Sequence, residues 1–215
     1  LGKEEYKEMH KAISRDCITL VKYKDRDVLP ITPERYKRIM IVHVKGAESG
    51  MGMLMKAMGM GGGKNPAEML KERLCEKGFD AFIYESPLDA MKKQIAAGEK
   101  PNINLYFAGK NAIDDFVSGM DLVITLCDVS SGRPSFGLSK GGGEIPWYVF
   151  ELPVVVIGCG QPTMLADVPQ ARTYINTYDA KPATFDALVD DLMAGPDAFK
   201  GRDPIDSFCG LFDAR

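Results

Sequence analysis

The sequence PVVVIGCGQPTMLADVPQARTYINTYDAKPATFDALVDDLMAGPDAFKGRDPIDSFCGLFD, residues Pro153 to Asp213, decides the fold of this chain. It begins with an apolar strand, Pro153 to Ile157, followed by a Gly-Cys-Gly turn and a short capped helix around Met164 to Asp167. A β-rich run, Ala171 to Tyr178, then precedes an amphipathic helix from Pro182 to Met193 that ends at a Gly-Pro pair. Strands that alternate with helices in this way predict a parallel sheet covered by helices.

The same alternation extends back to the N-terminus. The predicted helices are Lys3 to Arg15, Asn65 to Lys77, Ser86 to Gly98 and Asn111 to Ser118, and the predicted strands are Cys17 to Tyr23, Arg38 to Val44, Asp80 to Tyr84 and Asp121 to Cys127. We therefore expect one α/β domain over residues 1–215, with residues 1–36 as a lead-in helix and linker. Its architecture should be a three-layer αβα sandwich with a mostly parallel, doubly wound sheet of five or six strands.

Composition excludes two classes of partner. The chain has 215 residues, 45% hydrophobic content and a formal net charge of -3, without the clustered basic excess of a nucleic-acid-binding protein. The longest apolar run, Leu152 to Ile157, is far shorter than the roughly 20 residues of a membrane helix. We therefore predict no nucleic-acid partner and no membrane span.

The cysteines argue against metal and redox chemistry. Five of them are widely spaced, with no C-x-x-C pair: Cys17, Cys75, Cys127, Cys159 and Cys209. No H-E-x-x-H or other ligand spacing appears, so the sequence predicts no metal and no cofactor. We expect buried structural thiols in a reducing compartment, which favours the cytoplasm.

Two glycine-containing loops follow predicted strands. In the first, Gly46 to Lys64, a phosphate-binding loop ending at Lys64 would need glycine at position 58 and a hydroxyl residue at position 65, where the chain has Met58 and Asn65. This failure disfavours a nucleotide-binding domain. The alternative is a Met-rich segment that fills a gap or meets a partner.

The second loop, Asp128 to Ile145, leaves the carboxyl end of a strand, where open α/β sheets bind ligands. Its polar candidates for contact with a substrate are Asp128, Arg133, Lys140 and Glu144. The alternative is a solvent-exposed loop with ordinary surface charges. Elsewhere, we expect His43 to be a hydrogen-bonded core residue and Asp190-Asp191 to lie on a solvated helix face.

Several segments resemble the C-terminal domain of glycoside hydrolase family 3. They occur in the family's order: AISRDCITLVKYKDRDVLPI, RIMIVHV, GGEIPWYVFELP, ADVPQARTYINTY and FKGRDPIDSFCGLFDAR. The later segments look most like the β-N-acetylhexosaminidase branch from Gram-positive bacteria. The resemblance implies a retaining glycosidase, acting on a carbohydrate, whose first domain is a (β/α)8 barrel in the same polypeptide.

The resemblance also limits what this chain can do alone. In the family the nucleophilic aspartate lies on the barrel, and in the hexosaminidase branch the acid/base histidine does too, so the isolated chain should be inactive. The glucosidase branch instead carries its acid/base glutamate on a loop of the second domain, and Glu144 is the residue placed to resemble it. The chain begins Leu1-Gly2-Lys3, which suggests an excised segment, and we expect an exposed apolar patch where the barrel would dock. A stand-alone carbohydrate- or small-ligand-binding module is the alternative.

Overall fold

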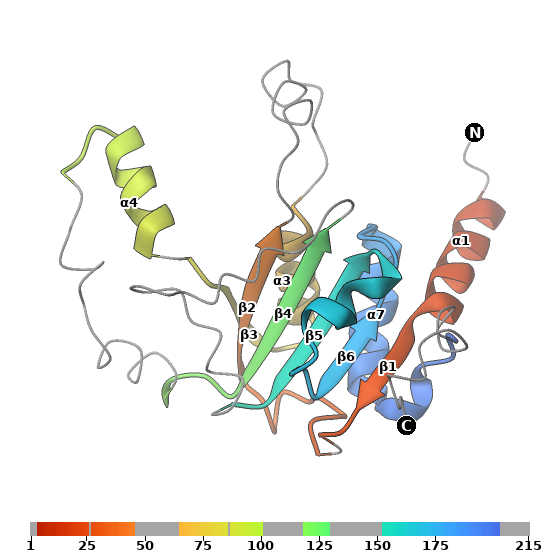
Figure 1. The fold of residues 1–215 in the computed structure, drawn as a ribbon. Coiled ribbons are helices and arrows are strands. Elements are labelled where there is room, and N and C mark those ends of the chain that lie inside the picture. The colour runs from red at the N-terminus through yellow and green to blue at the C-terminus, as the bar shows by residue number, and fades with distance from the viewer. Residues whose placement is uncertain are drawn as a thin grey trace.

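A computed structural model describes residues 4–25, 27–45, 65–85, 87–100, 118–129 and 152–202 of the chain. The helices and short 3-10 helices are α1 (Glu4–Cys17), α3 (Pro66–Glu76), α4 (Pro87–Ala96), η2 (Pro162–Asp167), α7 (Pro182–Ala194) and η3 (Pro196–Ala198). The strands are β1 (Thr19–Tyr23), β2 (Arg38–Lys45), β3 (Asp80–Ile83), β4 (Leu122–Val129), β5 (Val154–Gly160) and β6 (Thr173–Asn176). They form one twisted sheet with helices against it (Figure 1).

Within the described residues the sheet has six strands, in the order β1-β6-β5-β4-β2-β3. Four neighbouring pairs are parallel, and only the edge strand β1 runs antiparallel to its neighbour β6. The chain passes outward from β2 to β3 and then returns to place β4 on the other side of β2, so the strand order reverses between β2 and β4. The predicted fold class, a mostly parallel sheet flanked by helices, is confirmed, and its topological switch point lies between these two strands.

Each central strand is buried on both faces. One core contains alternate residues of the strands together with side chains of α3 and α7, among them Leu70, Leu74, Phe185 and Leu188. The second core, on the opposite face, includes Met164 and Leu165 of η2. Burial on both faces explains why the sequences of β2, β4 and β5 are nearly continuous apolar runs rather than alternating ones.

The helix boundaries follow local chemistry. The side chain of Asn65 accepts a hydrogen bond of 3.1 Å from the backbone N–H of Ala67, and Pro66 occupies the first turn of α3. Gly78, with φ of 94°, follows the end of α3, and Gly195, with φ of 103°, ends α7. Both glycines adopt a left-handed conformation that other residues enter only with strain. The predicted start and stop signals of these two helices are confirmed.

Two strands run further toward their carboxyl ends than the sequence predicts. The expected Gly-Cys-Gly turn after Ile157 is wrong, because residues 158–160 continue β5 and pair with residues 127–129 of β4. Gly158 is needed for packing: a Cβ atom there would lie 2.8 Å from Oδ1 of Asn176 and would collide with the Tyr174 hydroxyl. Asp128, expected at the start of a loop, is therefore a strand residue.

The N-terminal and helical predictions differ in smaller ways. The strand predicted at Cys17 to Tyr23 is confirmed as β1, which pairs with β6 at the edge of the sheet, so the expected lead-in segment also contributes a strand to the domain. The helix expected near Met164 is a 3-10 helix, whose first residues carry no side-chain cap. The helix expected at Asn111 to Ser118 lies outside the described residues, apart from its last residue.

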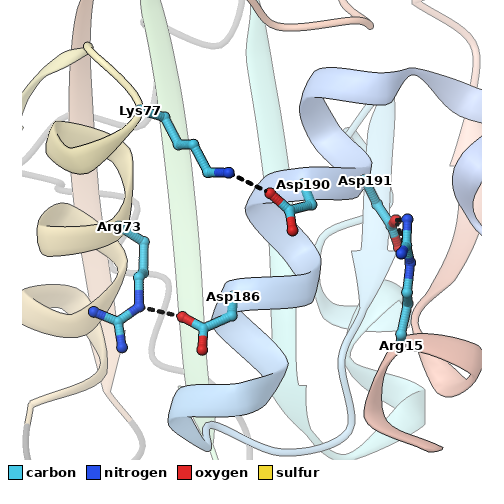
Figure 2. A network of polar contacts seen from close by, with 6 residues as sticks. All are labelled: Arg15, Arg73, Lys77, Asp186, Asp190 and Asp191. Atoms are coloured by element: carbon cyan, nitrogen blue, oxygen red, sulfur yellow. Dashed lines mark hydrogen bonds and ion pairs between the residues drawn. The ribbon is translucent and has the colours of Figure 1, made fainter. Parts of the chain in front are cut away.

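Charged side chains join the helix layer. Three aspartates of α7 bind basic residues of α3 and α1: Asp186 binds Arg73, Asp190 binds Lys77, and Asp191 binds Arg15 (Figure 2). In the last pair, at 3.1 Å, the Asp191 side chain is 0% exposed, whereas the Arg15 side chain is 53% exposed. The expectation of a solvated Asp190-Asp191 face is therefore wrong for Asp191, since α1 packs against α7 at this position. Burial raises the pKa of Asp191, and the neighbouring Arg15 opposes that rise.

Helix α1 carries an exposed apolar stripe. Tyr6, Met9 and Ile13, spaced three and four residues apart, are 57%, 51% and 53% exposed. Figure 1 shows α1 at the β1 edge of the sheet. None of the helices in the described part of the chain is both long and apolar enough to cross a bilayer.

Candidate functional site

The two predicted ligand loops start side by side at the switch point. Lys45, the last residue of β2, pairs in register with Asp128 of β4. Gly46 to Lys64 leaves from the first of these strands, and the second loop leaves from the other. The Met-rich segment and three of the four predicted contact residues, Arg133, Lys140 and Glu144, lie outside the described residues.

The fourth predicted contact residue, Asp128, faces a histidine. Nε2 of His43 lies 3.7 Å from Oδ2 of Asp128, and the two side chains are 7% and 33% exposed. This separation exceeds a hydrogen-bond length. Nε2 is buried, and no hydrogen-bond partner reaches it among the residues that the structure describes. The predicted burial of the His43 side chain is confirmed, and the hydrogen bond expected at Nε2 is not found among the described residues.

Strand geometry explains why these two side chains meet. Successive residues of a strand point to opposite faces, so His43 shares the face of Ile39 and Ile41, which is the face covered by α3 and α7. Asp128 shares this face with Leu126 by the same alternation. Because the strands are parallel and paired in register, both side chains lie near the carboxyl ends of their strands.

A cysteine lies next in the same row but is not a nucleophile. Cys159 pairs in register with Asp128, and its sulfur accepts a 3.3 Å hydrogen bond from the Thr177 hydroxyl. Burial raises the pKa of Cys159 to about 12; the Thr177 hydrogen bond opposes this, whereas the charges of Asp128 and Asp179 add to it. The thiol therefore stays protonated at neutral pH, and a protonated thiol is a poor nucleophile.

The other described cysteines divide into two groups. Cys127 is buried, and burial raises its pKa strongly, as expected of a structural thiol. Cys17 and Cys75 are exposed, so the expectation of burial is wrong for these two. All four described cysteines are free thiols, whereas Cys209 lies outside the described residues.

A tight turn carries a second carboxylate near the carboxyl ends of the parallel strands, which we call the carboxyl edge of the sheet. After β6, Tyr178 adopts a φ of 61°, an unusual left-handed conformation for a bulky residue, and its hydroxyl donates to the Thr19 hydroxyl at 3.0 Å. The carboxylate of Asp179 accepts hydrogen bonds from the Thr184 hydroxyl and the Lys181 backbone N–H just before and within the first turn of α7. Burial favours the neutral acid, but these hydrogen bonds prevail and lower the pKa of Asp179. It is therefore ionised at neutral pH.

The arrangement supports binding better than covalent chemistry. His43 supplies an imidazole nitrogen that has no hydrogen-bond partner among the described residues, and Asp128 supplies a partly exposed carboxylate beside it. Within the described ranges there is no group of three side chains that could hold a metal ion. The sequence pattern indicated Asp128 as a contact residue and His43 as a core residue; in the sheet His43 pairs with Leu126 and Asp128 pairs with Lys45, so the two side chains are diagonal neighbours on one face.

Comparisons with known proteins show which proteins the chain resembles. No protein-family model matches it. A β-N-acetylglucosaminidase/β-glucosidase of Cellulomonas fimi is 30% identical over 212 residues, which cover 95% of this chain and 33% of the relative.

Solved structures give the same result. The β-glucoside phosphorylase BglX matches 100% of this chain with a TM-score of 0.70 and 28% identity, over 34% of its own length. A glycoside hydrolase family 3 β-N-acetylglucosaminidase from Paenibacillus sp. str. FPU-7 matches 95% of this chain and 33% of its own, with a TM-score of 0.57 and 14% identity, and so supports the fold alone. The chain spans about a third of the length of these relatives. Nearly the whole chain is therefore similar to about a third of each of these proteins, and it shares its α/β fold with part of a glycoside hydrolase family 3 enzyme.

Proposed function

We propose that this chain is the non-barrel domain of an enzyme that hydrolyses β-linked N-acetylglucosaminides or glucosides, and that the rest of the parent polypeptide supplies the nucleophile. One observation carries the proposal: almost the whole chain aligns with a third of a β-N-acetylglucosaminidase/β-glucosidase. Among the described residues, the carboxyl edge has no nucleophile paired with a base, because the Cys159 thiol is held neutral. The domain therefore supports or closes the sugar cleft, and the isolated chain is inactive.

The sugar faces the carboxyl edge of the sheet in this proposal. Open α/β sheets bind ligands outside the carboxyl ends of their strands, at the switch point. The loops that follow β2 and β4 both begin there, and the second contains Glu144. If the parent follows the glucosidase branch, Glu144 is the acid/base; if it follows the hexosaminidase branch, the acid/base lies on the barrel.

The barrel of the same polypeptide is the partner that we propose for α1. The helix has 14 residues, a length at which an isolated helix is only marginally stable in water. Its stripe of Tyr6, Met9 and Ile13 is more than half exposed, and contiguous exposed apolar surface often marks an interface. The four free thiols among the described cysteines support a reducing compartment such as the cytoplasm for this protein.

Activity of the full-length parent tests the proposal. We expect release of the aryl group from an aryl β-N-acetylglucosaminide or an aryl β-glucoside by the wild type. Glu144→Gln should abolish most activity if Glu144 is the acid/base, and should leave it intact if the barrel carries that role. No activity on either substrate would contradict the enzyme proposal and favour a carbohydrate-binding module.

A second candidate reaction is phosphorolysis, which the similarity to BglX favours, since that protein is named a phosphorylase. Phosphate would then replace water as the acceptor of the glycosyl group, and the product would be a sugar phosphate. Adding inorganic phosphate to the same assay separates the two reactions. A rate that rises with phosphate, with a glycosyl phosphate as product, would assign phosphorolysis; a phosphate-independent rate with free sugar as product would assign hydrolysis.

A further inference from the structure

We propose that His43 and Asp128 form a hydroxyl-binding site that holds a sugar ring at the switch point of the sheet. The ligand class rests on the proposed function, whereas the site itself rests on the geometry of the two side chains. Neither residue needs to take part in bond cleavage, so both are binding residues here.

The separation of the two groups suits a shared ligand. Nε2 of His43 and Oδ2 of Asp128 lie 3.7 Å apart, too far for a direct hydrogen bond. Two hydrogen bonds of about 2.8 Å can converge from these atoms on a single hydroxyl oxygen between them. That hydroxyl donates its proton to the carboxylate and accepts from the imidazole N–H. If Nε2 instead carries the lone pair, a neighbouring hydroxyl can donate to it.

The burial of His43 points to an absent partner. Only 7% of its side chain is exposed, yet Nε2 lacks a hydrogen bond within the described part of the chain. Burying a polar nitrogen without a partner is costly, so such atoms are rare in folded proteins. Asp128 is a third exposed, and a group that binds Asp128 from solvent comes within reach of the nitrogen.

The groups around the site favour a neutral ligand over an anion or a metal ion. Asp128 and Asp179 place two carboxylates at this edge; the Lys181 ammonium lies 3.0 Å from Asp179, so the negative charge that disfavours a phosphate or carboxylate ligand is that of Asp128. The neighbouring Cys159 thiol is neutral and already accepts a hydrogen bond from Thr177. Among the described residues, the pair has no third ligand with which to hold a metal ion. A neutral molecule with adjacent hydroxyl groups is the ligand that remains, and a pyranose has them.

Nuclear magnetic resonance of the 215-residue chain provides the test. The chain has two histidines, His10 and His43, so two imidazole signals are readily assigned. We expect methyl β-glucoside or methyl N-acetyl-β-glucosaminide to shift the His43 signals saturably at about 10 mM, well above a millimolar dissociation constant. The His10 signals should not move. Inorganic phosphate at the same concentration should leave His43 unchanged.

Variants separate binding from folding. His43→Gln should remove sugar binding, which the backbone amide signals of β2 and β4 would report in this variant. Asp128→Asn should weaken sugar binding at least about tenfold, because a hydrogen bond to a charged group is lost. Asp80→Asn is the matched control: it removes the same charge at the amino end of β3, where Asp80 lies 3.7 Å from Lys37. It should bind sugar as the wild type does. If either site variant unfolds, the sugar titration of the wild-type chain still tests whether His43 binds the sugar.

Three outcomes would overturn the proposal. They are a His43 signal that neither sugar shifts in a folded chain, a response to phosphate equal to that to sugar, and undiminished binding by a folded His43→Gln variant. Each is independent of the enzyme proposal, which the activity of the parent tests. An active parent with an unresponsive His43 would remove this site and leave the proposed function standing.

Discussion

The helix layer and the carboxyl edge of the sheet differ in how their charged groups are paired, although Oδ2 of Asp191 also lacks a hydrogen bond and Asp179 at the edge pairs with Lys181 at 3.0 Å. On α7, Asp186, Asp190 and Asp191 each bind a basic side chain from α3 or α1 (Figure 2). At the edge, Asp128 stands 3.7 Å from His43 without a hydrogen bond, and the imidazole Nε2 has no partner among the described residues.

This difference separates residues that hold the fold from residues that are open to a ligand. Paired charges and buried apolar side chains stabilise the packing of α7 on α3, α1 and the sheet. A buried nitrogen without a partner lowers stability, because the hydrogen bonds that it made to water are not replaced within the described structure. Changes in the helix layer should therefore alter stability, and changes at the edge should alter binding.

The largest effect should come from the core under α7. Phe185 is 0% exposed, and Phe185→Ala should lower the free energy of unfolding by about 3–5 kcal/mol, because the mutation leaves a cavity. Urea unfolding measures the loss. Ile95→Ala on α4 is the control, since Ile95 is 58% exposed and should cost less than about 0.5 kcal/mol. Equal losses in the two variants would contradict the described packing of α7.

The ion pair between exposed Arg15 and buried Asp191 should give the next effect. Arg15→Ala leaves the Asp191 carboxylate buried without its cation and should cost about 1–3 kcal/mol at neutral pH. We expect urea unfolding curves to shift toward lower denaturant without a change in slope.

Asp191→Asn tests the same pair from its acidic side. Because burial raises the pKa of Asp191 against the opposition of Arg15, its contribution to stability is present below about pH 4 and is lost as pH rises through its pKa in the folded state. The variant should therefore match the wild type or exceed it by up to about 1 kcal/mol at pH 7, and any such advantage should disappear in acid, where Asp191 is protonated. A large loss at pH 7 would show that the ionised pair is net stabilising.

At the carboxyl edge, a non-polar substitution should be tolerated. His43→Leu removes the nitrogen that lacks a partner, so stability should stay within about 1 kcal/mol of the wild type or rise. Thermal unfolding of the chain provides the measurement. A loss of several kcal/mol would mean that the imidazole is a structural group, and the contrast between the two regions would fail.

The last prediction is that the two buried cysteines do not react with an alkylating reagent. Iodoacetamide at about pH 8 should label Cys17 and Cys75 and leave Cys127 and Cys159 intact, because burial raises the pKa of Cys159 to about 12 and that of Cys127 still further from its ordinary value. Mass spectrometry of the digested chain distinguishes the sites. Labelling of Cys159 in the folded chain would place it at an accessible, reactive position.

Much of the fold was predictable because local signals and burial agree. The apolar runs of β2, β4 and β5 predict strands buried on both faces, and the Asn65-Pro66 and Pro182 signals place α3 and α7. The antiparallel pairing of β1 with β6 was not predicted, because it joins segments more than 150 residues apart and no local pattern encodes it.

The candidate site was predictable only in part. A polar residue after an apolar strand drew attention to Asp128, but strand register decides that His43 faces it. Asp191 shows the same limit in the helix layer: its neighbour Asp190 is half exposed, and only the approach of α1 buries Asp191. Side-chain environments of this kind depend on tertiary contacts, which a single sequence does not display.

The most direct test compares the two regions in the full-length parent. We would measure kcat and KM on aryl β-N-acetylglucosaminide and aryl β-glucoside, together with thermal unfolding, for His43→Gln and Lys77→Gln. The account predicts that His43→Gln raises KM at least about tenfold with an unchanged unfolding temperature, because a substrate hydrogen bond is lost. Lys77→Gln breaks the exposed 2.6 Å pair with Asp190 and should leave KM unchanged. An unchanged KM in a folded, active His43→Gln enzyme would contradict the claim that the carboxyl edge of this domain holds the sugar.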